Sequence, residues 1–241
     1  MSDLRIGIIA EGPTDIIIIE KIVKLVFKDY RVVCVEISPT PDELNGIMDK
    51  PEGFGWGSVY KICHNLKDKL EILEAGNGSF DMIVIQVDGD VMFVTYESAR
   101  IHDAKIPTEL PCYIEGATIE ENCSLLESVI CNWKDCDVDS NIILCIPYIN
   151  TELWAAYCLY PSYKSQLIET LSKDDINSFL LSMPRKESRL LRDKNGRIRK
   201  LTKGYRDAAN QMDERLIDEM KSKFTQFRKF HRMLTDFKGQ C

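Results

Sequence analysis

Five carboxylates of this chain stand just after apolar runs or at the start of the segments that follow them: Glu11, Asp15, Asp88, Asp90 and Glu152. In an open parallel sheet, functional groups gather at the edge where the strands end, so we expect these five side chains to converge there. Crowded carboxylates repel one another and need a compensating cation at neutral pH. Oxygen ligands in this number favour Mg²⁺ or Mn²⁺, so the pattern predicts a divalent metal site.

The spacing of these acids is compatible with a shared site. Glu11 closes an apolar run and Asp15 follows one helical turn later, so both can face the same point. Asp88 and Asp90 are separated by a single glycine, which lets the backbone turn tightly. Each acid also has a simpler interpretation. An acid after a strand can solvate a turn, and Asp15 and Glu152 are each favourable near the positive end of a helix.

Apolar runs and helical periodicity predict the elements that position these acids. Strands are expected at 4–10, 31–37, 81–87, 111–114 and 141–147. Helices are expected at 14–28, 58–74, 119–133 and 151–159, and then at 174–182, 204–220 and 223–236. This alternation predicts an α/β fold with an open, mostly parallel sheet and helices on both faces. We expect an α/β domain over residues 1–160 and a helical, basic C-terminal extension over 161–241, packed on it.

Charge is distributed unevenly along the chain, whose formal net charge is −7. Residues 1–184 hold 14 Lys and Arg against 30 Asp and Glu, whereas residues 185–241 hold 17 against 8. A basic segment beside an acidic site suits a polyanion such as nucleic acid. The candidate binding residues are Arg185, Lys186, Arg189, Arg192, Lys194, Arg197, Arg199 and Lys200. The alternatives are a solvated basic surface or a protein partner, and Asn195-Gly196 predicts a hairpin turn or a mobile loop within the segment.

Composition places the 241-residue chain among ordinary globular proteins, with 44% hydrophobic and 29% charged residues. Nine cysteines without a CxxC pair indicate reduced thiols and a cytoplasmic location. We expect neither a signal peptide nor a membrane-spanning segment. The three histidines lack the spacing of a zinc site.

Two of the acidic motifs resemble those of a known fold. The stretch 6–15 (IGIIAEGPTD) resembles the opening strand–Glu-Gly–helix motif of the TOPRIM fold, and 83–90 (IVIQVDGD) resembles its strand–DxD motif. The similarity is closest to small TOPRIM-like proteins related to the nucleases of the overcoming-lysogenization-defect class. In those proteins a later acidic segment and a lysine contribute to the site. Here 147–154 (PYINTELW) and 203–205 resemble these two segments, and the resemblance gives Lys203 the role of offsetting charge on the phosphorus centre.

The resemblance implies a metal-dependent nuclease that uses two Mg²⁺ or Mn²⁺ ions, and it suggests a setting in anti-phage defence. Glu11, Asp15, Asp88 and Asp90 would hold the cations, and Glu152 would complete the second site. Glu11 would also act as a general acid or base.

The resemblance leaves a second class of function open. Relatives are often fused to an ATPase or encoded beside one, and this chain has no GxxxxGK[ST] loop of its own. The protein would then be a non-catalytic TOPRIM-like subunit that docks on an ATPase or another defence partner. Topoisomerase and primase activities fit less well, because the chain is short and has no visible zinc-binding module.

Overall fold

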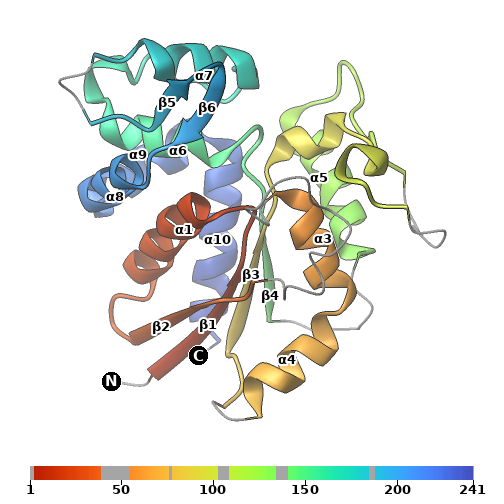
Figure 1. Ribbon diagram of the computed structural model, residues 1–241. Coiled ribbons are helices and arrows are strands. Elements are labelled where there is room, and N and C mark those ends of the chain that lie inside the picture. The colour runs from red at the N-terminus through yellow and green to blue at the C-terminus, as the bar shows by residue number, and fades with distance from the viewer. Residues whose placement is uncertain are drawn as a thin grey trace. The chain divides into compact units, whose positions relative to one another are not determined.

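The computed structural model describes residues 3–38, 55–75, 78–102, 109–133, 141–184 and 188–240 (Figure 1). The chain forms two compact units, which are described separately. The sheet unit comprises Met1–Gly12 and Lys28–Ile146, and the helical unit comprises Pro13–Phe27 and Pro147–Cys241. In the described residues, no helix is both long and apolar enough to span a membrane.

Four parallel strands form the sheet of the sheet unit, in the order β2-β1-β3-β4 (Figure 1). They are β1 (Asp3–Ile9), β2 (Arg31–Glu36), β3 (Met82–Gln86) and β4 (Ile142–Cys145). Every residue of β3 is buried, as expected of a strand with neighbours on both sides in a parallel sheet. The predicted α/β fold with an open parallel sheet is confirmed.

The strand order creates a switch point between β1 and β3. The chain leaves β1 for β2 on one side and later returns to form β3 on the other side of β1. In doubly wound sheets with this order, ligands bind beyond the carboxyl ends of the two strands at the switch. Glu11 and Asp88 follow those two ends, so the topology places them at the edge that the sequence predicts.

Helices of the sheet unit lie to one side of its strands (Figure 1). They are α3 (Trp56–His64), α4 (Leu66–Glu74) and α5 (Ile119–Cys131), with the short 3₁₀ helices η1 (Gly89–Phe93) and η2 (Tyr96–Ala99). Trp56, Tyr60, Tyr96 and Trp133 pack ring against ring in the core. Residues 111–114, predicted as a strand, are not one, because the N–H groups of Cys112 and Tyr113 donate to the Met92 carbonyl of η1.

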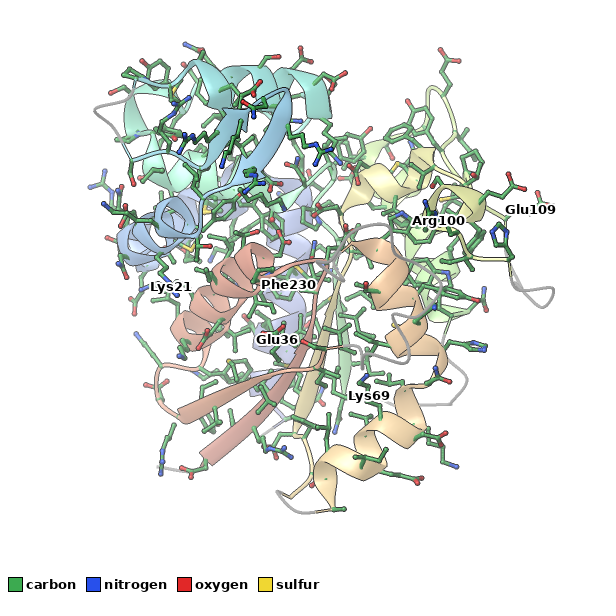
Figure 2. The ribbon with its side chains drawn as sticks, in the orientation of Figure 1. Lys21, Glu36, Lys69, Arg100, Glu109 and Phe230 are labelled. Carbon is green, nitrogen blue, oxygen red and sulfur yellow. The ribbon has the colours of Figure 1, made fainter. Side chains whose placement is uncertain are left out.

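The helical unit contains α1 (Pro13–Val26), α6 (Thr151–Leu159), η3 (Pro161–Tyr163), α7 (Lys173–Ser182), α8 (Thr202–Gln211), α9 (Glu214–Lys223) and α10 (Thr225–Lys238). Phe27 of the segment after α1 meets Phe237 of α10 edge to face, with ring centroids 6.2 Å apart. Phe230 of α10, labelled in Figure 2, is buried. All of α6 is buried, which explains its apolar sequence.

The compact units divide the chain at places other than residue 160, since α1 and α6 pack with the C-terminal helices. One sequence expectation needs correction in this unit. The helix predicted at 204–220 is two helices, since Asp213 caps the start of α9 and interrupts it.

A β-hairpin also lies in the helical unit, within the basic segment. Strands β5 (Leu191–Lys194) and β6 (Arg197–Lys200) pair antiparallel. Asn195 and Gly196 connect them with φ angles of 58° and 74°, the positive values that a two-residue type I′ turn requires. The turn predicted from Asn195-Gly196 is thus confirmed as that of a hairpin.

Candidate functional site

Glu11, Gln86 and Asp88 form a closed set of hydrogen bonds in the sheet unit, here called the sheet-edge triad. The Glu11 N–H donates to Gln86 Oε1 over 3.0 Å, and Gln86 Nε2 donates to Asp88 Oδ1 over 2.7 Å. The Asp88 N–H donates to Glu11 Oε1 over 2.8 Å. These bonds tie the segment after β1 to the segment after β3, and their donors are amide N–H groups.

The sequence prediction missed Gln86, which is fully buried at the last position of β3. A lone amide in the otherwise apolar run 82–87 was the available signal, since a buried amide needs hydrogen-bond partners. Asp88 is buried, whereas Asp90 is half-buried in the first turn of η1. Because the chain enters a 3₁₀ helix here, the two aspartates do not alternate along a continuing strand.

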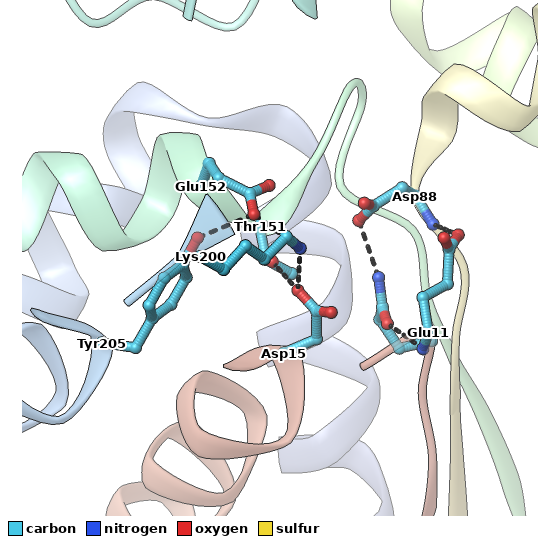
Figure 3. A network of polar contacts seen from close by, with 8 residues as sticks. Glu11, Asp15, Asp88, Thr151, Glu152, Lys200 and Tyr205 are labelled. Atoms are coloured by element: carbon cyan, nitrogen blue, oxygen red, sulfur yellow. Dashed lines mark hydrogen bonds and ion pairs between the residues drawn. The ribbon is translucent and has the colours of Figure 1, made fainter. Parts of the chain in front are cut away.

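Asp15 and Glu152 form a buried pair of carboxylates in the helical unit, here called the acid pair (Figure 3). Asp15 lies in the first turn of α1 and Glu152 in the first turn of α6. Lys200, at the end of β6, places its Nζ atom 2.6 Å from Glu152 Oε1 and 3.4 Å from Asp15 Oδ1. One ammonium group therefore contacts both acids.

Two hydroxyl groups complete the surroundings of the acid pair. Thr151 Oγ1 donates to Asp15 Oδ1, and the Tyr205 hydroxyl of α8 donates to Glu152 Oε1 over 2.8 Å (Figure 3). Tyr205 itself is fully buried. The pair is thus held by residues of α1, α6, β6 and α8, which all belong to the helical unit.

The two acids of the pair differ in their electrostatics. Burial raises the pKa of Asp15, and its more distant contact with Lys200 offsets this only in part. Burial acts in the same direction on Glu152, but Lys200 and the Tyr205 hydroxyl outweigh it and lower the pKa of Glu152 below its usual range. The shorter contact of Lys200 with Glu152 explains the difference, so Glu152 is the more readily ionised member.

The acid pair has more negative than positive charge when both members are ionised, because Lys200 supplies a single ammonium group. Asp15 Oδ2 is buried and has no hydrogen-bond partner among the described residues. A buried, unpartnered carboxylate oxygen is costly, and a bound ion is one of the features that explain it. Two buried carboxylates with one unpartnered oxygen therefore have the chemistry needed to bind a cation.

The five predicted metal ligands fall into two sets. Glu11, Asp88 and Asp90 belong to the sheet unit, and Asp15 and Glu152 to the helical unit. Within the described ranges, no group of three or more His, Cys, Asp or Glu side chains could hold a metal ion. In the sheet unit, hydrogen bonds of the triad engage Glu11 and Asp88, and in the helical unit Lys200 contacts both Asp15 and Glu152.

The lysine that contacts the acid pair is Lys200 rather than Lys203. Lys203 is exposed in the first turn of α8, whereas Lys200 reaches the acid pair. The prediction of Lys203 followed the resemblance. The register of the hairpin decides which basic residue points toward the acid pair, and this register could not be predicted from the sequence.

The predicted nucleic-acid-binding residues differ in their exposure. Arg185 and Lys186 lie outside the described residues. Arg189 is half-buried and donates from Nη2 to the Leu181 carbonyl over 2.6 Å, so it packs locally. The exposed members are Arg192, Lys194, Arg197 and Arg199 on the hairpin.

Comparisons with other proteins give no independent identification. No protein-family model matches the chain, and neither the curated proteins nor the solved structures yielded a match. Function must therefore be argued from the geometry of the two sites.

Proposed function

We propose that the protein is a metal-dependent nuclease that hydrolyses phosphodiester bonds of nucleic acid. The observation that carries this proposal is the acid pair, in which one ammonium group serves two buried carboxylates and Asp15 Oδ2 lacks a partner among the described residues. Such a pair is more stable with a further positive charge nearby. The neighbouring basic hairpin belongs to the same unit and suits a phosphate-bearing substrate.

Asp15 and Glu152 would hold Mg²⁺ or Mn²⁺. Mg²⁺ is often bound by one or two carboxylates, with water and substrate phosphates as its other ligands, so a pair is sufficient without a protein cage of three acids. When bound, the cation supplies Lewis-acid stabilisation of the charge that develops on a phosphoryl oxygen.

The other residues of the site would orient the carboxylates and neutralise phosphate charge. Thr151 and Tyr205 each hold one carboxylate in place through a hydroxyl group. With a cation neutralising the two carboxylates, Lys200 would be available to pair with a phosphate oxygen of the substrate. This assigns to Lys200 the charge-offsetting role that the resemblance gives to Lys203.

The sheet-edge triad has a separate part in the proposal. The resemblance to TOPRIM proteins makes Glu11 a metal ligand and a general acid or base, and makes Asp88 and Asp90 metal ligands. The buried position of Asp88 and the fixed Glu11 carboxylate support pre-organisation of these groups. Metal binding and catalysis by the triad stay predictions, as does a setting in anti-phage defence.

A second candidate function follows from the same contacts. Lys200 already neutralises part of the acid pair, and one Glu11 oxygen accepts a backbone N–H. Both arrangements would also serve a non-catalytic subunit that docks on an ATPase or another defence partner.

Cleavage assays separate the two candidates. Single- and double-stranded DNA and RNA are incubated with the protein and Mg²⁺ or Mn²⁺, using wild type, Glu152→Gln, Asp15→Asn, Glu11→Ala and Asp88→Ala. Because a metal ion stabilises the developing charge strongly, removal of one of its ligands is expected to lower the rate about 100-fold or more. Asp174→Asn, which removes an acid from the first turn of α7, is the matched control and should cleave at the wild-type rate.

Retained cleavage in both acid-pair variants would remove this pair from the reaction. Retained cleavage in Glu11→Ala and Asp88→Ala would do the same for the triad. No cleavage by the wild-type protein on any of these substrates, with either cation, would favour the docking subunit.

A further inference from the structure

The pairing register of the hairpin sorts its side chains onto two faces. Arg192 lies opposite Arg199 and Lys194 opposite Arg197, whereas Leu191 lies opposite Lys200 and Asp193 opposite Ile198. Directly opposed residues share a face, and successive residues alternate between faces. One face therefore carries Arg192, Lys194, Arg197 and Arg199, and is here called the cationic face.

The opposite face of the hairpin is the one attached to the helical unit. Leu191 on this face is buried, and Lys200 reaches the acid pair. Asp193, the acid of the hairpin, also lies on this side and accepts the Gly196 N–H across the turn over 2.9 Å. The Asp193 carboxylate therefore bonds within the turn, and it does not lie among the cations of the other face.

The cationic face is exposed and has unbalanced charge. All four of its residues are exposed, and in the described part of the chain none of them forms an ion pair. Like charges directly opposed across two strands destabilise a hairpin, so this arrangement costs stability in the free protein. A polyanion would relieve the repulsion, and phosphates in a row match cations that repeat along a strand about 6.6 Å apart.

Lys200 connects this face to the acid pair. It is the last residue of β6 and follows Arg199 of the cationic face directly. Its side chain is 38% exposed, so another phosphate of the same polyanion, reaching past the end of β6, can compete with the carboxylates for its ammonium group. If Lys200 turns to a phosphate, the acid pair is left with two buried charges and binds a divalent cation more tightly.

We propose that the hairpin binds the phosphate backbone of nucleic acid on its cationic face, independently of sequence, and that Lys200 couples this binding to cation uptake at the acid pair. The proposal rests on the proposed function for the identity of the polyanion. By linkage, the cation must then strengthen nucleic-acid binding by the same factor as nucleic acid strengthens cation binding.

The first test measures binding without any divalent cation and therefore without cleavage. Fluorescence anisotropy of labelled DNA and RNA oligonucleotides in EDTA compares wild type with a variant carrying Arg192→Gln, Lys194→Gln, Arg197→Gln and Arg199→Gln. The matched control removes four exposed cations elsewhere in the unit: Arg206→Gln, Lys223→Gln, Arg228→Gln and Arg232→Gln. Circular dichroism verifies folding, and the double variant Arg192→Gln with Arg199→Gln is the milder alternative.

We expect the hairpin variant to bind about 30-fold more weakly or worse, and the slope of log affinity against log salt to fall by about 0.9 for each phosphate that the variant no longer neutralises. The control should stay within about threefold of wild type, a change too small for four phosphates. Equal weakening in hairpin variant and control would overturn the assigned face. Binding of polyglutamate but not of nucleic acid would overturn the choice of polyanion in favour of an acidic protein partner.

The second test measures the coupling through Lys200. Oligonucleotide affinity is determined with and without Ca²⁺, as a non-cleaving probe cation, at constant ionic strength. Wild type should bind about 5-fold or more tightly with Ca²⁺, within the usual range of such couplings, and Lys200→Met should lose this gain. No gain in wild type, or an equal gain in Lys200→Met, would overturn the coupling. Neither test depends on cleavage, so the nuclease proposal can fail while both of these succeed.

Discussion

The sheet-edge triad and the acid pair show two ways to stabilise buried carboxylates. In the triad, the Gln86 amide donates to Asp88 and the Asp88 backbone N–H donates to Glu11. In the acid pair, Lys200 provides a formal charge, and hydroxyl groups assist. An amide N–H fixes the position of a carboxylate but carries no formal charge. Lys200 carries a formal charge, and its side chain belongs to an exposed hairpin. The triad is therefore held by hydrogen bonds, whereas the acid pair also depends on the charge of Lys200.

Removal of Lys200 should have the largest effect on stability. Lys200→Met leaves two buried carboxylates without their counter-ion. Loss of one partner of a buried ion pair costs about 3–5 kcal/mol, and partial exposure of Lys200 reduces this to about 2–3 kcal/mol. Urea denaturation at pH 7 measures the change in unfolding free energy.

The loss in Lys200→Met should shrink as the pH falls, because protonation of the acid pair removes the repulsion. Lys203→Met is the control and should change stability by less than about 0.5 kcal/mol. A similar loss at pH 7 and at acidic pH would contradict the role of Lys200 as the counter-ion.

Replacement of Gln86 should have a smaller effect of a different kind. Gln86→Met keeps the volume but leaves the Glu11 N–H and Asp88 Oδ1 without the amide, at a cost of about 1–2 kcal/mol. Because no formal charge is lost, the cost should be nearly the same at low and high salt, in contrast to Lys200→Met. A loss that salt abolishes would show that the triad is also held by charge.

Asp15→Asn should have the smallest effect on stability, and it should stabilise the protein where Lys200→Met and Gln86→Met destabilise it. Burial raises the pKa of Asp15 above its usual range, so the folded wild type binds more protons than the unfolded chain between the two pKa values. Wild-type stability must then fall as pH rises through the raised pKa. The variant escapes this loss, so we expect it to gain up to about 1 kcal/mol relative to wild type at neutral pH.

Thermal unfolding of Asp15→Asn and wild type as a function of pH measures this gain. Glu152→Gln is the matched comparison, since the pKa of Glu152 is lowered. The stabilising contribution of Glu152 is therefore present above the pKa of an unfolded glutamate and lost as pH falls through the lowered value. Glu152→Gln should thus destabilise the protein at neutral pH. Destabilisation by Asp15→Asn that grows with pH would contradict the assignment.

Local sequence patterns predicted much of the framework. Apolar runs located the four strands, and Asn195-Gly196 indicated the hairpin turn. The acids were correctly placed after strands or at helix starts, as Asp15 in α1 shows. These features depend on neighbours in the chain, which the sequence displays directly.

Contacts between distant segments were not predictable in the same way. Lys200 meets Asp15 and Glu152 because of the hairpin register and the packing of α1, α6 and α8, and adjacent Arg199 points the other way. Gln86 gains its importance only from the partners that β1 brings beside β3. The composition of the compact units has the same origin, since α1 packs with α8 and α10, which lie far beyond it in the chain.

Calorimetric titration of the protein with Mn²⁺ tests most directly whether the acid pair is a cation site. We predict saturable binding to wild type that is lost in the double variant Asp15→Asn with Glu152→Gln and retained in Asp174→Asn. Absence of Mn²⁺ binding in wild type, or undiminished binding in the double variant, would contradict the assignment of the acid pair as a cation site.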